Sequence, residues 1–249
     1  MAAKESDRDR QARESAYARA VGGRAEERWG WASPAGRVRA ERRAELVSWA
    51  AGLKPAALAL EVGCGNGHFT EKYARSGAEL IATDLSPELI RLARQKYPGP
   101  RTSYLPAPAD RLPFPDAGFD ALVGNSILHH LDLATALPEF YRVLKPGAAL
   151  AFAEPNFLNP QMLLQRSLPW LRRLAGDSPD ETAFVRFTLS RRLRQVGFTG
   201  VVITPFDFLH PATPPALIPF VSALGKILEA LPLLREFAGS LLIQARKPE

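Results

Sequence analysis

The sequence predicts an open, doubly wound α/β sheet, and three observations support this prediction. Short, continuous apolar runs alternate along the middle of the chain with stretches of helical periodicity. This alternation implies parallel strands joined by right-handed crossovers. The apolar runs have no polar face, as expected when helices cover both sides of a parallel sheet. A length of 249 residues and a 46% apolar composition suit one elaborated domain with a sizeable core.

The first part of the pattern contains five strands and the helices between them. In chain order, the expected strands are 58–62, 79–84, 102–105, 119–125 and 148–154. The helices expected between them begin at Asn66 and cover 87–97 and 133–144. Each helix follows a strand directly, which is the arrangement of successive strand-helix-strand units.

After residue 154 the alternation is interrupted twice. It resumes with a helix over 189–198 and a strand over 200–208, and it ends with an apolar run over 240–247. Helical lid insertions at about 157–187 and 210–239 account for the interruptions, and residues 1–45 are expected to form an N-terminal helical cap on a domain covering 46–249. Apolar residues recur every three or four positions in the second insertion, which predicts one or two amphipathic helices. These residues are Leu217, Phe220 with Val221, Leu224, Ile227 with Leu228, Leu231 and Leu234.

Composition limits the compartment and the partners. The net charge of +6 favours acidic partners without naming one. The one cysteine, Cys64, has no internal disulfide partner, so a reducing, cytoplasmic compartment is expected. The first residues are highly charged and contain no apolar signal region. No transmembrane segment is expected, because the most apolar stretch, 211–234, is interrupted by four prolines and carries Lys226 and Glu229.

A glycine-rich loop follows the first strand. Residues 61–67 read Glu-Val-Gly-Cys-Gly-Asn-Gly and lead into a helix, where backbone N–H groups and the helix dipole favour a nucleotide-like ligand. Asp84 ends the second strand 19 residues after Gly65, close to the spacing at which an acid binds a ribose diol. A plain turn is the structural alternative for the glycines.

The residues around this loop indicate which ligand it binds. A dinucleotide-binding loop would have a third glycine at position 68, where this chain has His68. The carboxylate of Glu61 would repel a pyrophosphate and attract an ammonium group. The ligand is therefore expected to be a nucleoside joined to an amino acid.

Four segments together resemble the successive motifs of a known family. They are LALEVGCGNGHFT (58–70), IATDLSPELIRLAR (81–94), LPFPDAGFDALVGNSILHHLD (112–132) and EFYRVLKPGAALAFAEPN (139–156). They resemble the class I S-adenosylmethionine-dependent methyltransferases, in the small-molecule branch that includes quinone-biosynthesis enzymes. The resemblance is close over about 46–154 and looser in the C-terminal part.

The resemblance implies a Rossmann-like methyltransferase fold with seven strands, an antiparallel last strand over 240–247, and S-adenosylmethionine as cofactor. It places the methionine moiety against the glycine loop, the ribose on Asp84 and the adenine beside Leu85. Pro108 stands where the family often has an aspartate for the adenine amino group, which leaves the backbone of Ala109 or the side chain of Asp110 for that contact. The expected cofactor-binding residues are Glu61, Gly63, Cys64, Gly65, Gly67, Asp84, Leu85, Ala109, Asp110 and Asn125.

Three residues after the fourth and fifth strands are candidates for catalysis. His130 is a candidate general base, His129 is a second one, and Glu154 is a third candidate for base or acceptor ligand. Each has a structural alternative, in which the histidines bond backbone carbonyls and the carboxylate fixes a loop. The arginines of 37–43 either form a solvated helix face or pair with a carboxylate of the cofactor or acceptor.

The expected function is transfer of the methyl group of S-adenosylmethionine to a small, hydrophobic acceptor at oxygen or carbon. A covalent mechanism through cysteine is excluded, because Cys64 belongs to the cofactor loop. No metal site and no nucleic-acid partner are expected, and the oligomeric state is not predicted. The alternatives are an NAD(P)-dependent Rossmann oxidoreductase and a basic nucleic-acid-binding protein.

Overall fold

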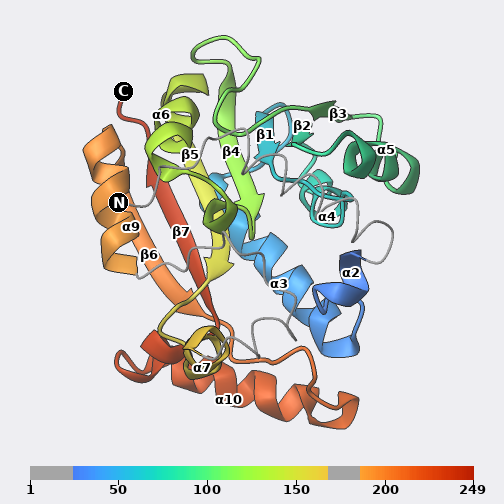
Figure 1. Cartoon of the computed structure of the whole chain (residues 1–249), viewed down its shortest axis with the longest axis vertical. Helices are drawn as coiled ribbons and strands as arrows, with labels where there is room; N and C mark the ends of the chain where they lie inside the picture. The colour runs from blue at the N-terminus through green and yellow to red at the C-terminus, as the bar shows by residue number, and fades with distance from the viewer. Residues whose placement is uncertain (1–24, 168–185) are drawn as a thin grey trace, which may run out of the picture.

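The computed structural model describes residues 25–167 and 186–249, and seven strands in these residues form one sheet (Figure 1). The order across the sheet is β3-β2-β1-β4-β5-β7-β6. Neighbouring strands from β3 to β5 are parallel, whereas β7 is antiparallel to both β5 and β6. The predicted doubly wound, mostly parallel sheet with an antiparallel last strand is confirmed. The strands are β1 (Leu58–Val62), β2 (Glu79–Asp84), β3 (Thr102–Pro106), β4 (Phe119–Asn125), β5 (Leu144–Pro155), β6 (Thr199–Phe206) and β7 (Ser240–Arg246).

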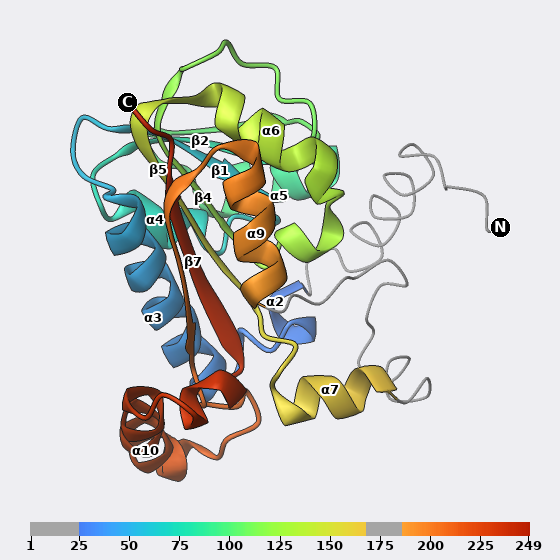
Figure 2. The same cartoon turned by 90° about the vertical axis from the view of Figure 1, so that its left-hand side faces the viewer.

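Helices cover both faces of the sheet, so the described part has three layers (Figure 2). On one face, α3 (Pro34–Ala51) and α4 (Thr70–Ala74) pack on β1, β4 and β5, with α5 (Pro87–Lys96) beside them on β2 and β3. On the other face, α6 (Leu133–Val143) and α9 (Arg186–Val196) pack on β1, β4 and β7. Side chains alternate between the two faces along β1. Ala59 packs with residues of α3 and α4, and Leu60 packs with residues of α6 and α9.

Local signals in the sequence set the ends of several helices. Ser33 caps α3 by accepting a hydrogen bond from the Gly36 N–H at 2.9 Å, and Ser86 caps α5 in the same way through Leu89. The helix expected from Asn66 begins only at Thr70. Gly67 has a φ of +85°, which a right-handed helix does not accommodate, so the loop continues past it.

The two predicted insertions leave the sheet at its carboxyl edge, the edge at which the parallel strands end (Figure 1). After β5 comes α7 (Pro160–Ser167), and the rest of that insertion up to residue 185 lies outside the described residues. After β6 come η3 (Pro215–Leu217), α10 (Ile218–Ala230) and η4 (Leu234–Phe237). Their action as lids stays a prediction.

The expected N-terminal cap is described only from α2 (Ala25–Arg28) onward. Its expected boundary at residue 45 falls inside α3, a continuous helix of 18 residues that packs on the sheet. Within the described residues, none of the helices has both the length and the apolar character needed to cross a bilayer.

Candidate active site

The glycine loop lies at the carboxyl edge between the end of β1 and the start of α4. Gly63, Gly65 and Gly67 all have positive φ, at +69°, +55° and +85°. A Cβ on Gly63 would lie 2.4 Å from Ile127, and a Cβ on Gly67 would lie 2.9 Å from Tyr97, whereas the nearest atoms to one on Gly65 are 3.7 Å away. The outer two glycines therefore allow the loop to pack on the protein, whereas a Cβ on Gly65 would only reach van der Waals contact with the Trp29 ring.

Glu61 places a carboxyl group behind this loop. Its side chain is almost fully buried, and its Oε2 makes no hydrogen bond to the described part of the chain. Burial raises the pKa of Glu61 to about 8, with a further increase from the negative charge of Asp84 and a partial decrease from the nearby Thr70 hydroxyl. At neutral pH the carboxyl is mostly protonated, and a cationic group beside it would favour ionisation.

Asp84 ties the loop to the next strand and helix. Its Oδ2 accepts a hydrogen bond from Gly65 N–H at 2.9 Å, and its Oδ1 accepts one from Ser86 N–H at 2.9 Å. The side chain is half-buried at the end of β2. Each carboxylate oxygen accepts more than one hydrogen bond, so these two backbone contacts fix the carboxylate in place and leave it able to accept from a diol.

The other residues expected near the adenine lie beside Asp84. Leu85 follows it directly and is half-buried, and Ala107 N–H donates to the Asp84 carbonyl at 2.9 Å where the chain leaves β3. Ala109 is buried in the core on the α6 side, and Asp110 is half-buried next to it. The structure thus places these predicted residues on two loops at the carboxyl edge, one after β2 and one after β3, and their contact with adenine stays a prediction.

Cys64 points into the protein between β2 and α5. It is buried with Ala82 and Ile90, and burial, followed by the charges of Asp84 and Glu61, raises the pKa of its thiol well above the ordinary value. A thiol in this state is a poor nucleophile.

The segment before α3 covers the glycine loop from outside. Glu26 forms an ion pair with Lys96 of α5 and accepts a hydrogen bond from Asn66 Nδ2 at 3.3 Å. Trp31 stacks on His68, with ring centroids 6.4 Å apart and planes 21° from parallel. A Cβ on Gly65 would lie 3.7 Å from Trp29. The N-terminal segment is therefore held to both the loop and α5.

Arg43 extends from α3 to the carboxyl edge and is fully buried. Its Nη1 donates to Asn125 Oδ1 at 2.9 Å and to Ser126 Oγ at 3.3 Å, and its Nη2 donates to Ser240 Oγ at the start of β7. The Asp207 carboxylate lies 4.0 Å from Nε. Burial and the charge of Arg39 lower the pKa of Arg43 to about 10, so it stays cationic at neutral pH.

The expectation of a solvated arginine face on α3 is wrong for three of its arginines. Arg39 Nε binds the Asp207 carboxylate at 2.7 Å, and Arg42 forms a two-pronged ion pair with Glu229 of α10, at 2.8 and 2.6 Å. Together with Arg43 they connect α3 to α10 and to the end of β6. A pattern in the sequence marks Arg43, because it falls on the apolar stripe of the helix. That stripe consists of Ala40, Ala44, Val47 and Ala51.

Glu154 and His129 form a buried pair at the ends of β5 and β4. Glu154 Oε2 lies 2.7 Å from His129 Nδ1, and Glu154 Oε1 accepts hydrogen bonds from Ile127 and Leu128 N–H, each at 2.8 Å. Burial alone would raise the pKa of Glu154, but the charge and hydrogen bond of His129 and the two backbone donors outweigh it and lower the pKa. This carboxylate holds the 126–130 turn in place.

His130 lies next in η2 (Leu128–His130), and its ring centroid is 4.2 Å from that of His129. It is half-buried, whereas His129 is buried. Asn125 is turned toward Arg43 rather than toward the glycine loop, so its expected contact with the cofactor stays a prediction. Of the three catalytic candidates, His130 is the most accessible from the carboxyl edge.

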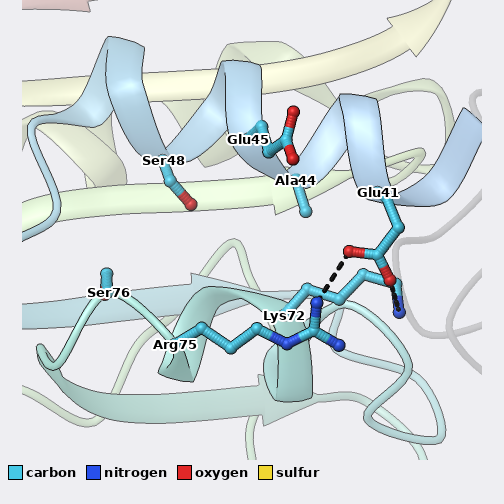
Figure 3. A pocket seen from close by; sticks show the side chains of 7 residues that line it. All are labelled: Glu41, Ala44, Glu45, Ser48, Lys72, Arg75 and Ser76. Carbon is cyan, nitrogen blue, oxygen red and sulfur yellow. Dashed lines mark hydrogen bonds and ion pairs between the residues drawn. The ribbon is translucent and has the colours of Figure 1, made fainter.

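A pocket lies between α3 and α4 (Figure 3). It has a volume of about 300 Å³, and in it Glu41 binds both Lys72 and Arg75 at 3.1 and 2.7 Å. None of the expected site residues lines it. In the described ranges, 25–167 and 186–249, no three His, Cys, Asp or Glu side chains are grouped as metal ligands.

We compared the chain with known protein families. Residues 60–152 match the family model described as "Methyltransferase domain". A demethylmenaquinone methyltransferase of Streptomyces avermitilis is 30% identical over 173 residues, which cover 62% of this chain and 74% of that protein. A malonyl-[acyl-carrier protein] O-methyltransferase of Pectobacterium atrosepticum is 35% identical over 118 residues, covering 47% of this chain and 44% of the relative. The chain thus spans less than half of some of the curated relatives that it matches.

The fold is also similar to that of solved structures. A chain of the complex between the Haloferax volcanii Trm112 methyltransferase activator and its methyltransferase superposes with a TM-score of 0.67, covering 94% of this chain and 97% of that one at 21% identity. At this identity the likeness concerns the fold alone. With the glycine loop, Asp84 and the strand order in place, and with a 30% identical relative matched over 74% of its length, this chain belongs to the class I S-adenosylmethionine-dependent methyltransferases.

Proposed function

We propose that this protein transfers the methyl group of S-adenosylmethionine to a small acceptor with a substantial hydrophobic part, at an oxygen or carbon atom. The observation that carries the proposal is the buried carboxyl of Glu61 behind the glycine loop. A carboxylate in this position suits an amino group and disfavours the pyrophosphate of a nicotinamide cofactor. The oxidoreductase alternative is therefore disfavoured, and the nucleic-acid alternative has only the net charge to support it.

The residues at the carboxyl edge fit this cofactor in three respects. Glu61 Oε2 is a buried acceptor without a hydrogen bond to the described residues, and an ammonium group would supply the missing donor. Gly65 has no side chain, and a Cβ there would lie 3.7 Å from the Trp29 ring that covers the loop, so a ligand that replaced this ring could come close to the backbone. The Asp84 carboxylate is fixed by Gly65 and Ser86 N–H at the strand end where a ribose diol would bind.

When bound, S-adenosylmethionine supplies a methyl group that is already activated by a positively charged sulfur. The chain then has to hold the acceptor in line, exclude water and receive the acceptor's proton. We assign the last task to the imidazole of His130. His129 and Glu154 act as positioning residues, because their buried pair fixes the turn that carries His130.

The hydrophobic character of the acceptor is inferred from the first insertion, in which Leu158, Met162, Leu163 and Leu164 follow β5 at the carboxyl edge. The names of two relatives give demethylmenaquinone and malonyl-[acyl-carrier protein] as methyl acceptors. These two acceptors differ widely, so the similarity leaves the acceptor of this chain open. For a small polar metabolite, an insertion of this size and composition would not be needed.

Product mass spectrometry of a panel graded from hydrophilic to hydrophobic acceptors tests the proposal. We expect a gain of one methyl group, dependent on S-adenosylmethionine, mainly on the hydrophobic members. Exclusive methylation of the hydrophilic members would contradict the acceptor class. Binding of a nicotinamide cofactor in place of S-adenosylmethionine would contradict the whole proposal.

Replacing Asp84 by alanine is expected to weaken binding of S-adenosylmethionine by roughly 10- to 100-fold, because hydrogen bonds to a charged acceptor are lost. Isothermal titration calorimetry measures the effect, with circular dichroism to verify folding. Glu88→Ala is the matched control, since Glu88 is an exposed acid four residues away in α5. Equal affinity of a folded Asp84→Ala variant would remove Asp84 from the site.

Glu61 predicts a pH dependence of cofactor binding. With its pKa at about 8 in the free protein, the carboxyl must lose a proton to pair with the amino group, so affinity should rise with pH below that value. We expect an increase of about tenfold from pH 6 to pH 7 and proton release in calorimetry at pH 7. Glu61→Gln should bind more weakly and lose the dependence. A pH-independent wild-type affinity would contradict this role.

His130→Ala is expected to lower kcat by roughly 100- to 10,000-fold with a smaller change in KM, because a general base acts in the transition state. The activity of the variant should no longer follow an imidazole titration in its pH profile. His210→Ala serves as control, since His210 is an exposed histidine on the segment between β6 and η3. A variant that keeps wild-type turnover at every pH would show that His130 is structural.

A further inference from the structure

One face of α10 is apolar and exposed, although the helix is firmly attached to the protein by its other face. On the attached face, Glu229 binds Arg42 through both oxygens and accepts a hydrogen bond from Asp207 N–H at 2.8 Å. Gly225 is the buried residue of the helix and packs against Phe208. The charged side chain of Glu229 is thus on the inner side of α10. In a typical surface helix, charged side chains face the solvent and apolar ones face the protein.

The outward residues of α10 form a stripe that we call the α10 apolar face. Phe220 is 66% exposed and Ile227 is 61% exposed, and Leu224 and Leu231 fill the same helical stripe between and after them. Exposed leucines continue the surface at both ends of the helix. The α10 apolar face consists of Leu217, Phe220, Leu224, Ile227, Leu231, Leu233 and Leu234.

The charges around this face have one sign. Lys226 is exposed on α10, about 100° around the helix from Ile227, and so lies at the edge of the apolar face. The two acids of α10 and η4 are turned to arginines of the chain, Glu229 to Arg42 and Glu236 to Arg186. The outward side of the segment 217–237 therefore offers apolar side chains and a cation, with its carboxylates neutralised on the inner side.

The position of α10 relates this face to the site. The helix lies beyond the ends of β6 and β7, at the end of the molecule toward which the parallel strands point (Figures 1 and 2). Asp207 directly follows β6 at the same edge, where its carboxylate binds Arg39 and its backbone N–H donates to the Glu229 carboxylate of α10. A surface that approached the α10 apolar face would approach the edge that carries the glycine loop.

A lipid surface fits these features better than a second copy of the chain. A helix of this kind can sink its apolar face into the boundary between headgroups and acyl chains, while lysine reaches back to anionic headgroups. In a two-fold dimer formed through this face, both copies of Lys226 would lie at the rim of one interface and add two positive charges to it. The nearby carboxylates, Glu229 and Glu236, are already engaged and could not neutralise them.

We propose that the α10 apolar face docks this protein on an anionic lipid surface, with the carboxyl edge of the sheet turned toward the lipid. The docking explains why large apolar side chains are kept exposed on a helix with a rigid anchor. This lipid docking goes beyond the proposed function. It rests on the proposed function only where it connects docking to a hydrophobic acceptor.

Co-sedimentation with vesicles tests the proposal on the full chain without cofactor or acceptor. The probes are phosphatidylcholine vesicles containing about one third phosphatidylglycerol, and pure phosphatidylcholine vesicles. We expect binding to the anionic vesicles, reduced at least about tenfold in the Phe220→Ser/Ile227→Ser double variant. Lys226→Glu should reduce binding to anionic vesicles roughly fivefold or more.

Trp49→Ser is the matched control, because Trp49 is 73% exposed near the end of α3 that leads to the start of β1, at the opposite edge of the sheet. It should bind vesicles as the wild type does. Absence of wild-type binding, or equal binding by the double variant, overturns the proposal. A wild-type dimer in light scattering that the double variant converts to a monomer, without vesicle binding, assigns the face to a second copy instead. Vesicle binding does not require methyl transfer. Failure of the lipid-docking proposal can therefore be distinguished from failure of the proposed methyltransferase function.

Discussion

The carboxyl edge of this protein depends on the burial of one cation, Arg43. Its guanidinium joins α3 to the ends of β4 and β7, through Asn125, Ser126 and Ser240, with the Asp207 carboxylate 4.0 Å away. An isolated cation is very costly to bury, so these partners are required for the helix to dock where it does. Removing one partner of a buried ionic group typically costs about 3–5 kcal/mol, more than most single contacts contribute.

The same set of charges extends outward to the second insertion. Asp207 binds Arg39, and its backbone N–H binds Glu229, which in turn holds Arg42. Asp207 adopts a φ of +76°, a conformation uncommon outside glycine, and the contacts at both its carboxylate and its backbone explain why it is kept. Charge pairing thus ties α10 to α3.

The site combines two carboxyl groups in different states. Glu61 is buried without a strong donor, and its pKa is raised, whereas Glu154 is equally buried but has His129 and two backbone donors, and its pKa is lowered. Burial acts in the same direction on both, so the difference comes from their hydrogen-bond partners. One carboxyl is therefore left ready for a cationic ligand, and the other is a fixed support for the turn that carries His130.

The sequence by itself determined the fold class, the succession of strands and helices along the chain and the position of the cofactor loop. These features are local or periodic: apolar runs of strand length, the glycines at 63, 65 and 67, and Asp84 at the end of the next strand. Family membership followed from the same motifs, because they occupy a continuous stretch of the chain. The antiparallel β7 was expected from the resemblance, and the structure confirms it.

Only the tertiary structure decided what the arginines of α3 and the apolar residues of α10 do. A solvated face or a carboxylate of the ligand was expected for Arg39, Arg42 and Arg43, yet their partners Asp207, Glu229 and Ser240 come from segments more than 150 residues later in the chain. Likewise, helical periodicity predicted α10 but could not say which face would be covered. Pairing across such separations depends on how the sheet is wound, and a local pattern carries no information about it. The chemistry of the edge was therefore set by contacts that form only when the strands are in place.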